Sequence, residues 1–328
     1  MTALPGTPAI QNAIPMPFFG TTPFAAPGLG IMAALIMFST GQWWLMHRAS
    51  VAQKKGEGYG KHDNPLIDPD TDLREHTADE GYDFNEITQD NRSGTPSFAL
   101  ALLPIIVVIV ANFSFSSIII PSWNIEFLSE PLFGSVGISS VLGLWSIILA
   151  LSLAIIVLIA LNWARFSSLS LSLDTGANAS ILPIFNTASL VGFGAVIAAL
   201  PAFEIVRNAV LGLGGDNPLI SLAIAVNILA GITGSASGGM SIALSTLGDT
   251  YLQMAQTAGI APEVLHRVTA IATGGLDALP HNGAVVTLLA ICGLTHRQSY
   301  ADVAMVAVIF PLGALMLTIL LESLFGSF

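Results

Sequence analysis

Charged residues are scarce in this chain, and their absence from long stretches is more informative than their number. Asp, Glu, Lys and Arg make up 9% of the 328 residues, against about 25% in a typical soluble domain. None occurs in residues 1–47, and further uncharged runs cover residues 93–125, 131–164, 175–203 and 217–248. Each run exceeds the roughly 20 apolar residues that a spanning helix needs. With a mean hydropathy of +0.75, this excludes a soluble domain and predicts an all-α polytopic membrane protein.

Other absences narrow the function. The single cysteine, Cys292, lies in an apolar run and cannot form an internal disulfide. The acidic residues that give the net charge of -11 are concentrated in residues 47–97, which we interpret as a solvated loop. The sequence has no basic face, so we do not expect a nucleic-acid partner. The sequence contains no HExxH, P-loop or GxGxxG motif of the kinds used by zinc proteases, ATPases and dinucleotide-binding enzymes. We therefore expect a non-enzyme without a cofactor or a metal site.

What the chain does contain is a repeated polar motif inside apolar sequence. TALPGTPAIQN (residues 2–12, the first motif) is echoed by DALPHNGAVVT (residues 277–287, the second motif). Polar, proline-bearing interruptions at corresponding places in two halves of a membrane protein are the best sequence indication of a transporter's substrate site. The motifs predict an inverted-repeat secondary transporter with broken helices.

The remaining pattern predicts how the two repeats are organised. Residues 1–46 are expected to end the first repeat, with a broken helix and one span, and residues 47–97 to form a cytoplasmic loop. The second repeat is expected over residues 98–328, with spans at 98–120, 138–163, 177–206 and 301–325, a re-entrant hairpin at 218–246 and a broken helix at 262–294. Because so little precedes the first motif, we expect the N-terminal part of the first repeat to be missing from this chain.

Basic residues indicate the orientation. If residues 47–97 are cytoplasmic and residues 218–246 return to the side they left, Arg165 and Arg297 also fall on the cytoplasmic side. Arg207 and Arg267 then lie outside or near that interface. This assignment predicts an extracytoplasmic C-terminus in a multi-pass protein of the bacterial inner membrane.

The second motif carries the strongest candidates for chemistry. Asp277, His281 and Asn282 are polar residues at membrane depth, where burial is costly unless the group is paired or functional. Pro280 and Gly283 interrupt the helix and free backbone N–H groups, which suit a carboxylate. We predict proton coupling by Asp277 or His281 and substrate binding by Asn282. The alternative is that Asp277 caps the following half-helix and His281 is a satisfied buried donor.

Two further segments supply neutral polar groups. The Gly- and Ser-rich tip of the predicted hairpin is expected to bind substrate through Thr233, Ser235, Ser237 and Gly238, although small residues also allow close helix packing. In the first motif, Thr7, Gln11 and Asn12 offer amide and hydroxyl groups but no charge, which suits recognition of substrate hydroxyls.

These segments resemble the GntP family of gluconate-type permeases, within the ion transporter superfamily. The resemblance rests on ALPGTPAIQN with FGTTPFAAP, NTASLVGFGAVI, GITGSASGG and LDALPHNGAVVTLL, and covers nearly the whole chain except residues 47–97. It implies proton-coupled uptake of a small hydroxylated monocarboxylate by alternating access, in an inner-membrane homodimer. The tip GSASGGMS is closer to relatives that carry 3-hydroxybutyrate than to gluconate carriers.

Two alternatives stay open. Unwound backbone carbonyls can also hold sodium, so a sodium-coupled carboxylate carrier is the first alternative. The second is an intramembrane serine protease, because Ser235 and Ser237 share the chain with a distant His281. The expected partners are a small organic acid, protons and the lipid bilayer.

Overall fold

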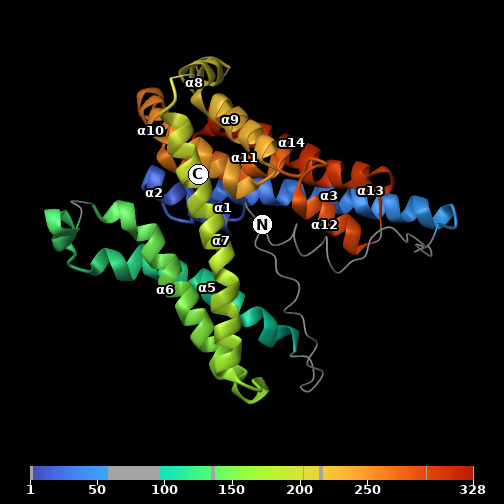
Figure 1. The fold of residues 1–328 in the computed structure, drawn as a ribbon, viewed down its shortest axis with the longest axis horizontal. Helices are drawn as coiled ribbons and strands as arrows, with labels where there is room; N and C mark the ends of the chain where they lie inside the picture. The colour runs from blue at the N-terminus through green and yellow to red at the C-terminus, as the bar shows by residue number, and fades with distance from the viewer. Residues whose placement is uncertain are drawn as a thin grey trace.

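The computed structural model describes residues 3–57, 97–133, 137–201, 203–213, 217–292 and 294–327, and every regular element in these ranges is a helix. In Figure 1, the helices α1–α3 and α8–α14 gather in one body, and the pair α5 and α6 extends away from it. The long helix α7 runs from the far end of this pair to the first body. The protein is therefore an all-α membrane protein, as the sequence predicts.

The N-terminal segment alternates short helices with turns. Helices α1 (Ile10–Ala13) and α2 (Pro15–Phe19) are followed by Gly20 in the left-handed region at φ 64°. Ala26, at φ 39°, then leads into α3 (Pro27–Lys54), which starts with the proline whose fixed φ suits a first helical position. We call residues 3–26 the first break.

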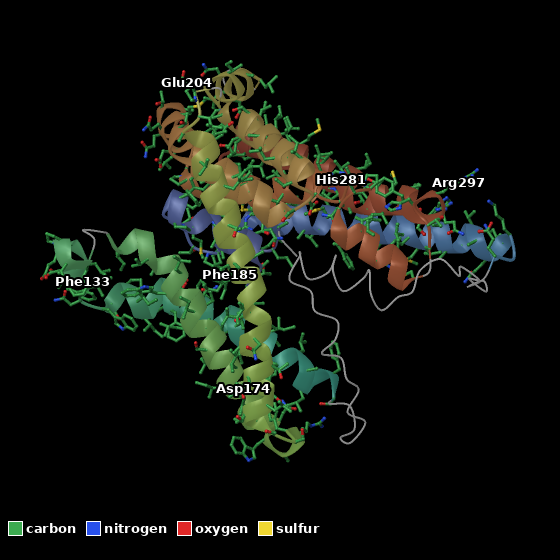
Figure 2. The ribbon with its side chains drawn as sticks, in the orientation of Figure 1. Phe133, Asp174, Phe185, Glu204, His281 and Arg297 are labelled. Carbon is green, nitrogen blue, oxygen red and sulfur yellow. The ribbon has the colours of Figure 1, made fainter. Side chains whose placement is uncertain are left out.

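Helix α5 (Phe98–Ser114) packs against α6 (Ile138–Leu161). It continues through a π-helical turn, Phe115–Ile119, and a short 3₁₀ turn. Helix α7 (Leu169–Ala198) packs on α10 and is followed by α8 (Phe203–Gly212). In Figure 2, Asp174 lies near the outer end of α7 and Glu204 lies on α8 at the opposite end of the molecule.

The C-terminal part holds a helical hairpin and a broken helix. The hairpin consists of α9 (Pro218–Thr233) and α10 (Ala236–Ala258), which are joined by Gly234 and Ser235. The broken helix consists of α11 (Pro262–Leu276) and α12 (Gly283–Ile291), separated by residues 277–282, which we call the second break. Helix α13 (His296–Ala304), a π-helical turn (Met305–Ile309) and α14 (Phe310–Phe325) follow.

Within the described ranges, four helical segments are long and apolar enough to cross a membrane. They are Pro27–Lys54, Phe98–Ser122, Val141–Leu161 and His296–Phe325. Many large apolar side chains on them are exposed, including Leu35, Phe38, Ile106 and Met316. Exposed apolar stripes of this length suit a lipid environment.

Several helix boundaries differ from those of the predicted segments. Helix α7 begins and ends earlier than the span predicted at 177–206, and its end agrees with the rule that a helix rarely continues through the residue before a proline such as Pro201. Helix α10 runs twelve residues past the predicted hairpin end at 246 and stops at Gly259, a left-handed C-cap. Helix α3 includes residues 47–54 of the predicted loop, and residues 58–96 of that loop lie outside the described residues.

The densest core lies between α3, α9, α10 and α11. Leu29, Leu222, Leu244 and Val268 are completely or almost completely buried there. Gly239 allows the hairpin to close, since a Cβ at this position would lie 2.2 Å from the backbone nitrogen of Ala230. Within this core, helix α11 contacts the first break and leads into the second break.

Candidate functional site

The first break is fastened to α11 by Arg267, which is fully buried. Its Nε and Nη2 atoms donate to the carbonyl oxygen of Ala25 at 2.9 and 2.6 Å, and Nη2 also donates to that of Pro23 at 3.1 Å. Its Nη1 donates to the carbonyl of Ala3 at 3.1 Å and to Oδ1 of Asn12 at 3.0 Å. These five bonds equal the number of N–H groups in a guanidinium. Arg267 thus closes two ends of the first break around itself.

His266 adds a second attachment. Its Nδ1 lies 2.6 Å from Oγ1 of Thr21, and its Nε2 lies 3.4 Å from Oδ1 of Asn12. Because the Asn12 oxygen only accepts, Nε2 carries the proton and Nδ1 accepts from the Thr21 hydroxyl. Gly30 of α3 makes room for the Ala3 carbonyl that accepts from Arg267, since a Cβ at Gly30 would lie 2.5 Å from this oxygen.

The structure gives partners to two residues that the sequence brought out. Arg267, which is predicted to lie outside the membrane or near its interface, is buried in the protein core. Asn12, a predicted substrate-binding residue of the first motif, donates from Nδ2 to Leu4 and Thr7 and accepts at Oδ1 from Arg267. A charged side chain that is distant in sequence therefore already bonds to the Asn12 amide.

The second break packs against the hairpin tip. Nε2 of His281 donates to the carbonyl of Gly231 at 2.9 Å, and Nδ2 of Asn282 donates to that of Gly234. Oδ1 of Asn282 accepts from the backbone N–H of Val285 at 3.1 Å. Asn282, the residue before α12, is therefore its N-cap. In Figure 2, His281 lies within the first body, close to where α11, α12 and α13 come together.

This contact brings two helix N-termini together. Ser235 caps α10, with its Oγ accepting from the N–H of Gly238 at 3.2 Å, and Asn282 caps α12. The two caps are adjacent because Asn282 bonds to Gly234, the residue before Ser235. The first amides of each helix have no partner within the helix, and both termini carry partial positive charge. The junction can therefore stabilise an anion such as a carboxylate.

Most of the predicted site residues lie at this junction. Thr233 bonds to the carbonyl of Leu229 within α9, and Oγ of Ser237 lies 3.5 Å from that of Ser235. Gly238 is buried in the first turn of α10, and Asp277 is half-buried at the end of α11. The predicted residues gathered at or beside the junction are Thr233, Ser235, Ser237, Gly238, Asp277, His281 and Asn282.

The predicted residues of the first motif lie around the other attachment. Thr7 donates to the Leu4 carbonyl, Asn12 binds Arg267, and Gln11 is half-buried in α1. From Arg267 to Leu276, α11 rises about 14 Å at 1.5 Å per residue. Arg267 grips the first break at one end of this length, and the second break begins at the other.

Sequence reasoning missed four residues that hold the breaks. They are His266 and Arg267 on α11, which bond to the first break, and His296 and Tyr300 on α13, which bond to the second break. Adjacent His and Arg in a helix surrounded by apolar sequence were an available signal, because charge at such a place is expected to be paired. This signal does not identify the partners, which for Arg267 are mainly backbone carbonyl groups.

An apolar groove of about 950 Å³ lies between α9 and α14 and reaches Asn227 and Leu276, behind the second break. Its walls are almost entirely aliphatic, so it does not suit a hydroxylated acid. In the part of the chain that the structure describes, no three His, Cys, Asp or Glu side chains are grouped as metal ligands.

Comparison with known proteins gives one relative. The chain is 44% identical over 315 residues to the uncharacterized transporter YxjC of Bacillus subtilis (strain 168), over 94% of its own length and 64% of that protein. The chain thus spans less than two thirds of the relative that it matches. No known family model matches the chain, and no solved structure matches it. The name of this relative supports the prediction of a transporter, whereas the resemblance to gluconate permeases stays a prediction.

Proposed function

We propose that this protein is a secondary transporter for a small hydroxylated monocarboxylate and that the carboxylate binds where the N-termini of α10 and α12 meet. The observation that carries the proposal is the pair of adjacent caps, Ser235 and Asn282. Two helix ends that converge on one point supply more positive potential and more free N–H groups than one end supplies. Ser237, beside this point, can bond to a substrate hydroxyl.

Proton coupling follows from the groups beside the caps. His281 directly precedes the Asn282 cap, and Asp277 directly follows α11, the helix that leads into the break. A proton on either group changes the charge next to the carboxylate site, which links proton uptake to substrate uptake. The 44% identity to a protein named a transporter supports the class. The finer assignments, gluconate or 3-hydroxybutyrate as substrate and the inner membrane as location, rest on the sequence resemblance.

Sodium coupling is the second candidate, and one observation favours it. The C-terminal ends of α9 and α11 also meet here, since a Cβ on Gly231 would lie 3.0 Å from the Cβ of Leu276. Helix C-termini present carbonyl groups, which are sodium ligands in broken-helix transporters. A protease has less support, because His281 donates to the Gly231 carbonyl and a serine hydroxyl is not its described partner.

The test is uptake into proteoliposomes that contain the purified protein. Labelled gluconate and 3-hydroxybutyrate are offered with an inward proton gradient, without a gradient, and with sodium replaced by choline. We expect the proton gradient to drive uptake of at least one of the two acids. Replacing sodium with choline is expected to leave this uptake unchanged. Uptake that follows sodium and ignores the proton gradient selects the second candidate, and no uptake of any hydroxy acid overturns the proposal.

A matched pair of variants locates the site. Asn282→Ala removes the α12 cap and is expected to reduce uptake at least tenfold, whereas Asn282→Asp keeps a capping oxygen but repels a carboxylate and is expected to reduce it further. If Asn282→Asp transports as well as the unaltered protein, the carboxylate binds elsewhere.

A further inference from the structure

Helix α13 provides further contacts to the second break, in addition to those with the hairpin tip. Nε2 of His296 lies 2.8 Å from the carbonyl oxygen of Pro280, and the hydroxyl of Tyr300 donates to that of Ala278 at 3.2 Å. A carbonyl only accepts, so the His296 Nε2 carries the proton. The two side chains are four residues apart and therefore point from the same face of the helix.

The break leaves these two carbonyls without helical donors. Helix α11 ends at Leu276, and the N–H of Asn282 goes to the carbonyl of Leu279 at 2.9 Å. Pro280 has no N–H, so it cannot close a turn on an earlier carbonyl. His296 and Tyr300 supply the missing donors on either side of that one turn. The conformation of the break therefore depends on a helix that is separate from it in sequence.

Helix α13 is in turn attached to α3. Oδ1 of Asp302 accepts from Nε1 of Trp44 at 2.9 Å and from Nε of Arg48 at 2.8 Å. His296 and Tyr300 lie six and two residues before Asp302 on the same helix. A chain of contacts thus connects α3, which follows the first break, with the second break.

We propose that α13 is a positioning element of the candidate transport site, in which His296 and Tyr300 fix the second break and Asp302 ties this grip to α3. Neither side chain is assigned a contact with substrate. They act through the backbone of residues 278–280, which leads directly to His281 and Asn282. This inference rests on the proposed function for its consequence, but the grip itself is testable without transport.

The first measurement is amide hydrogen exchange of a peptide covering residues 276–284 in the detergent-solubilised or reconstituted protein. Tyr300→Phe and His296→Ala each remove one donor and are expected to speed exchange in this peptide several-fold, and the double variant more than either. The matched control is Arg297→Ala, an exposed neighbour on α13 that is labelled in Figure 2. The double variant with exchange equal to that of Arg297→Ala overturns the proposal.

The second measurement is uptake. Tyr300→Phe is expected to raise the substrate KM about fivefold at an unchanged amount of protein in the membrane, because a loosened break holds the carboxylate less well. Faster exchange with an unchanged KM overturns the positioning role. If the unaltered protein takes up no hydroxy acid, the proposed function fails, while the exchange result still decides whether α13 holds the break.

The tie to α3 has its own variant. Asp302→Asn keeps the acceptor oxygen for Trp44 and removes the charge that faces Arg48. It is expected to speed exchange in residues 276–284 less than Tyr300→Phe does, because it acts one step further away. An exchange rate in Asp302→Asn equal to that of the unaltered protein removes α3 from the proposal.

Discussion

The two breaks share a sequence motif but are held in different ways. The first break surrounds a buried Arg267 that makes five bonds to it, and His266 adds two more contacts. The second break is held by single bonds from His281, Asn282, His296 and Tyr300, and His281 and His296 are exposed. The first break is held by one buried side chain that makes many hydrogen bonds. The second break is held by separate hydrogen bonds from several side chains.

This difference sets the free energy expected for releasing each break. A buried guanidinium that loses its partners costs several kcal/mol, so release of the first break from α11 is expected to be costly. A single neutral hydrogen bond contributes about 0.5–1.5 kcal/mol, so loss of any one bond to the second break is expected to cost little. Both breaks adjoin the same helix, α11.

The largest loss of stability is expected from Arg267→Gln, which tests how the first break is held. The carbonyls of Ala3, Pro23 and Ala25 would lose their donors in a buried place, and we expect a loss on the order of 3–5 kcal/mol of stability. Thermal unfolding in detergent measures the effect, with Arg297→Gln as the exposed control. An Arg267→Gln protein that melts with its control would show that the first break is not held by this residue.

A smaller loss is expected from Gly239→Ala, which tests the support beneath both breaks. The added Cβ would lie 2.2 Å from the Ala230 backbone nitrogen, so α9 and α10 must separate. Overpacking of this kind costs about 1–3 kcal/mol. The control is Gly313→Ala, where a Cβ meets nothing within 4 Å. Equal melting of the two variants would mean that the hairpin tolerates separation.

The smallest stability effect is expected at the second break. Asn282→Ala removes the N-cap of α12 and should cost about 1 kcal/mol of stability. Hydrogen exchange should rise in residues 283–286 and stay unchanged around Arg267. Exchange that rises equally around both breaks would contradict the conclusion that different residues hold them.

The sequence was a good guide to elements and a partial guide to sites. Uncharged runs located α3, α5 and α6, and Pro280 with Gly283 located the second break, because both signals are local. The end of α7 was missed because Pro201 limits the helix more strongly than the apolar pattern suggests. The extension of α10 was missed because the uncharged run ends before Asp249, whereas the helix continues to its C-cap at Gly259. The cluster around His281 and Asn282 was anticipated because polar groups are costly at membrane depth. The roles of Asn12, Arg267 and Tyr300 were not.

By itself, the sequence determined that this protein is made of membrane helices and where the two breaks lie, because hydrophobicity and proline geometry act over a few residues. Only the tertiary structure decided which side chains bond to each break. Arg267 reaches Ala3 and Ala25, and Tyr300 reaches Ala278, because a buried carbonyl without a helical donor must find one in whichever helix packs beside it. That neighbour is set by the packing of the whole core, which no local pattern records.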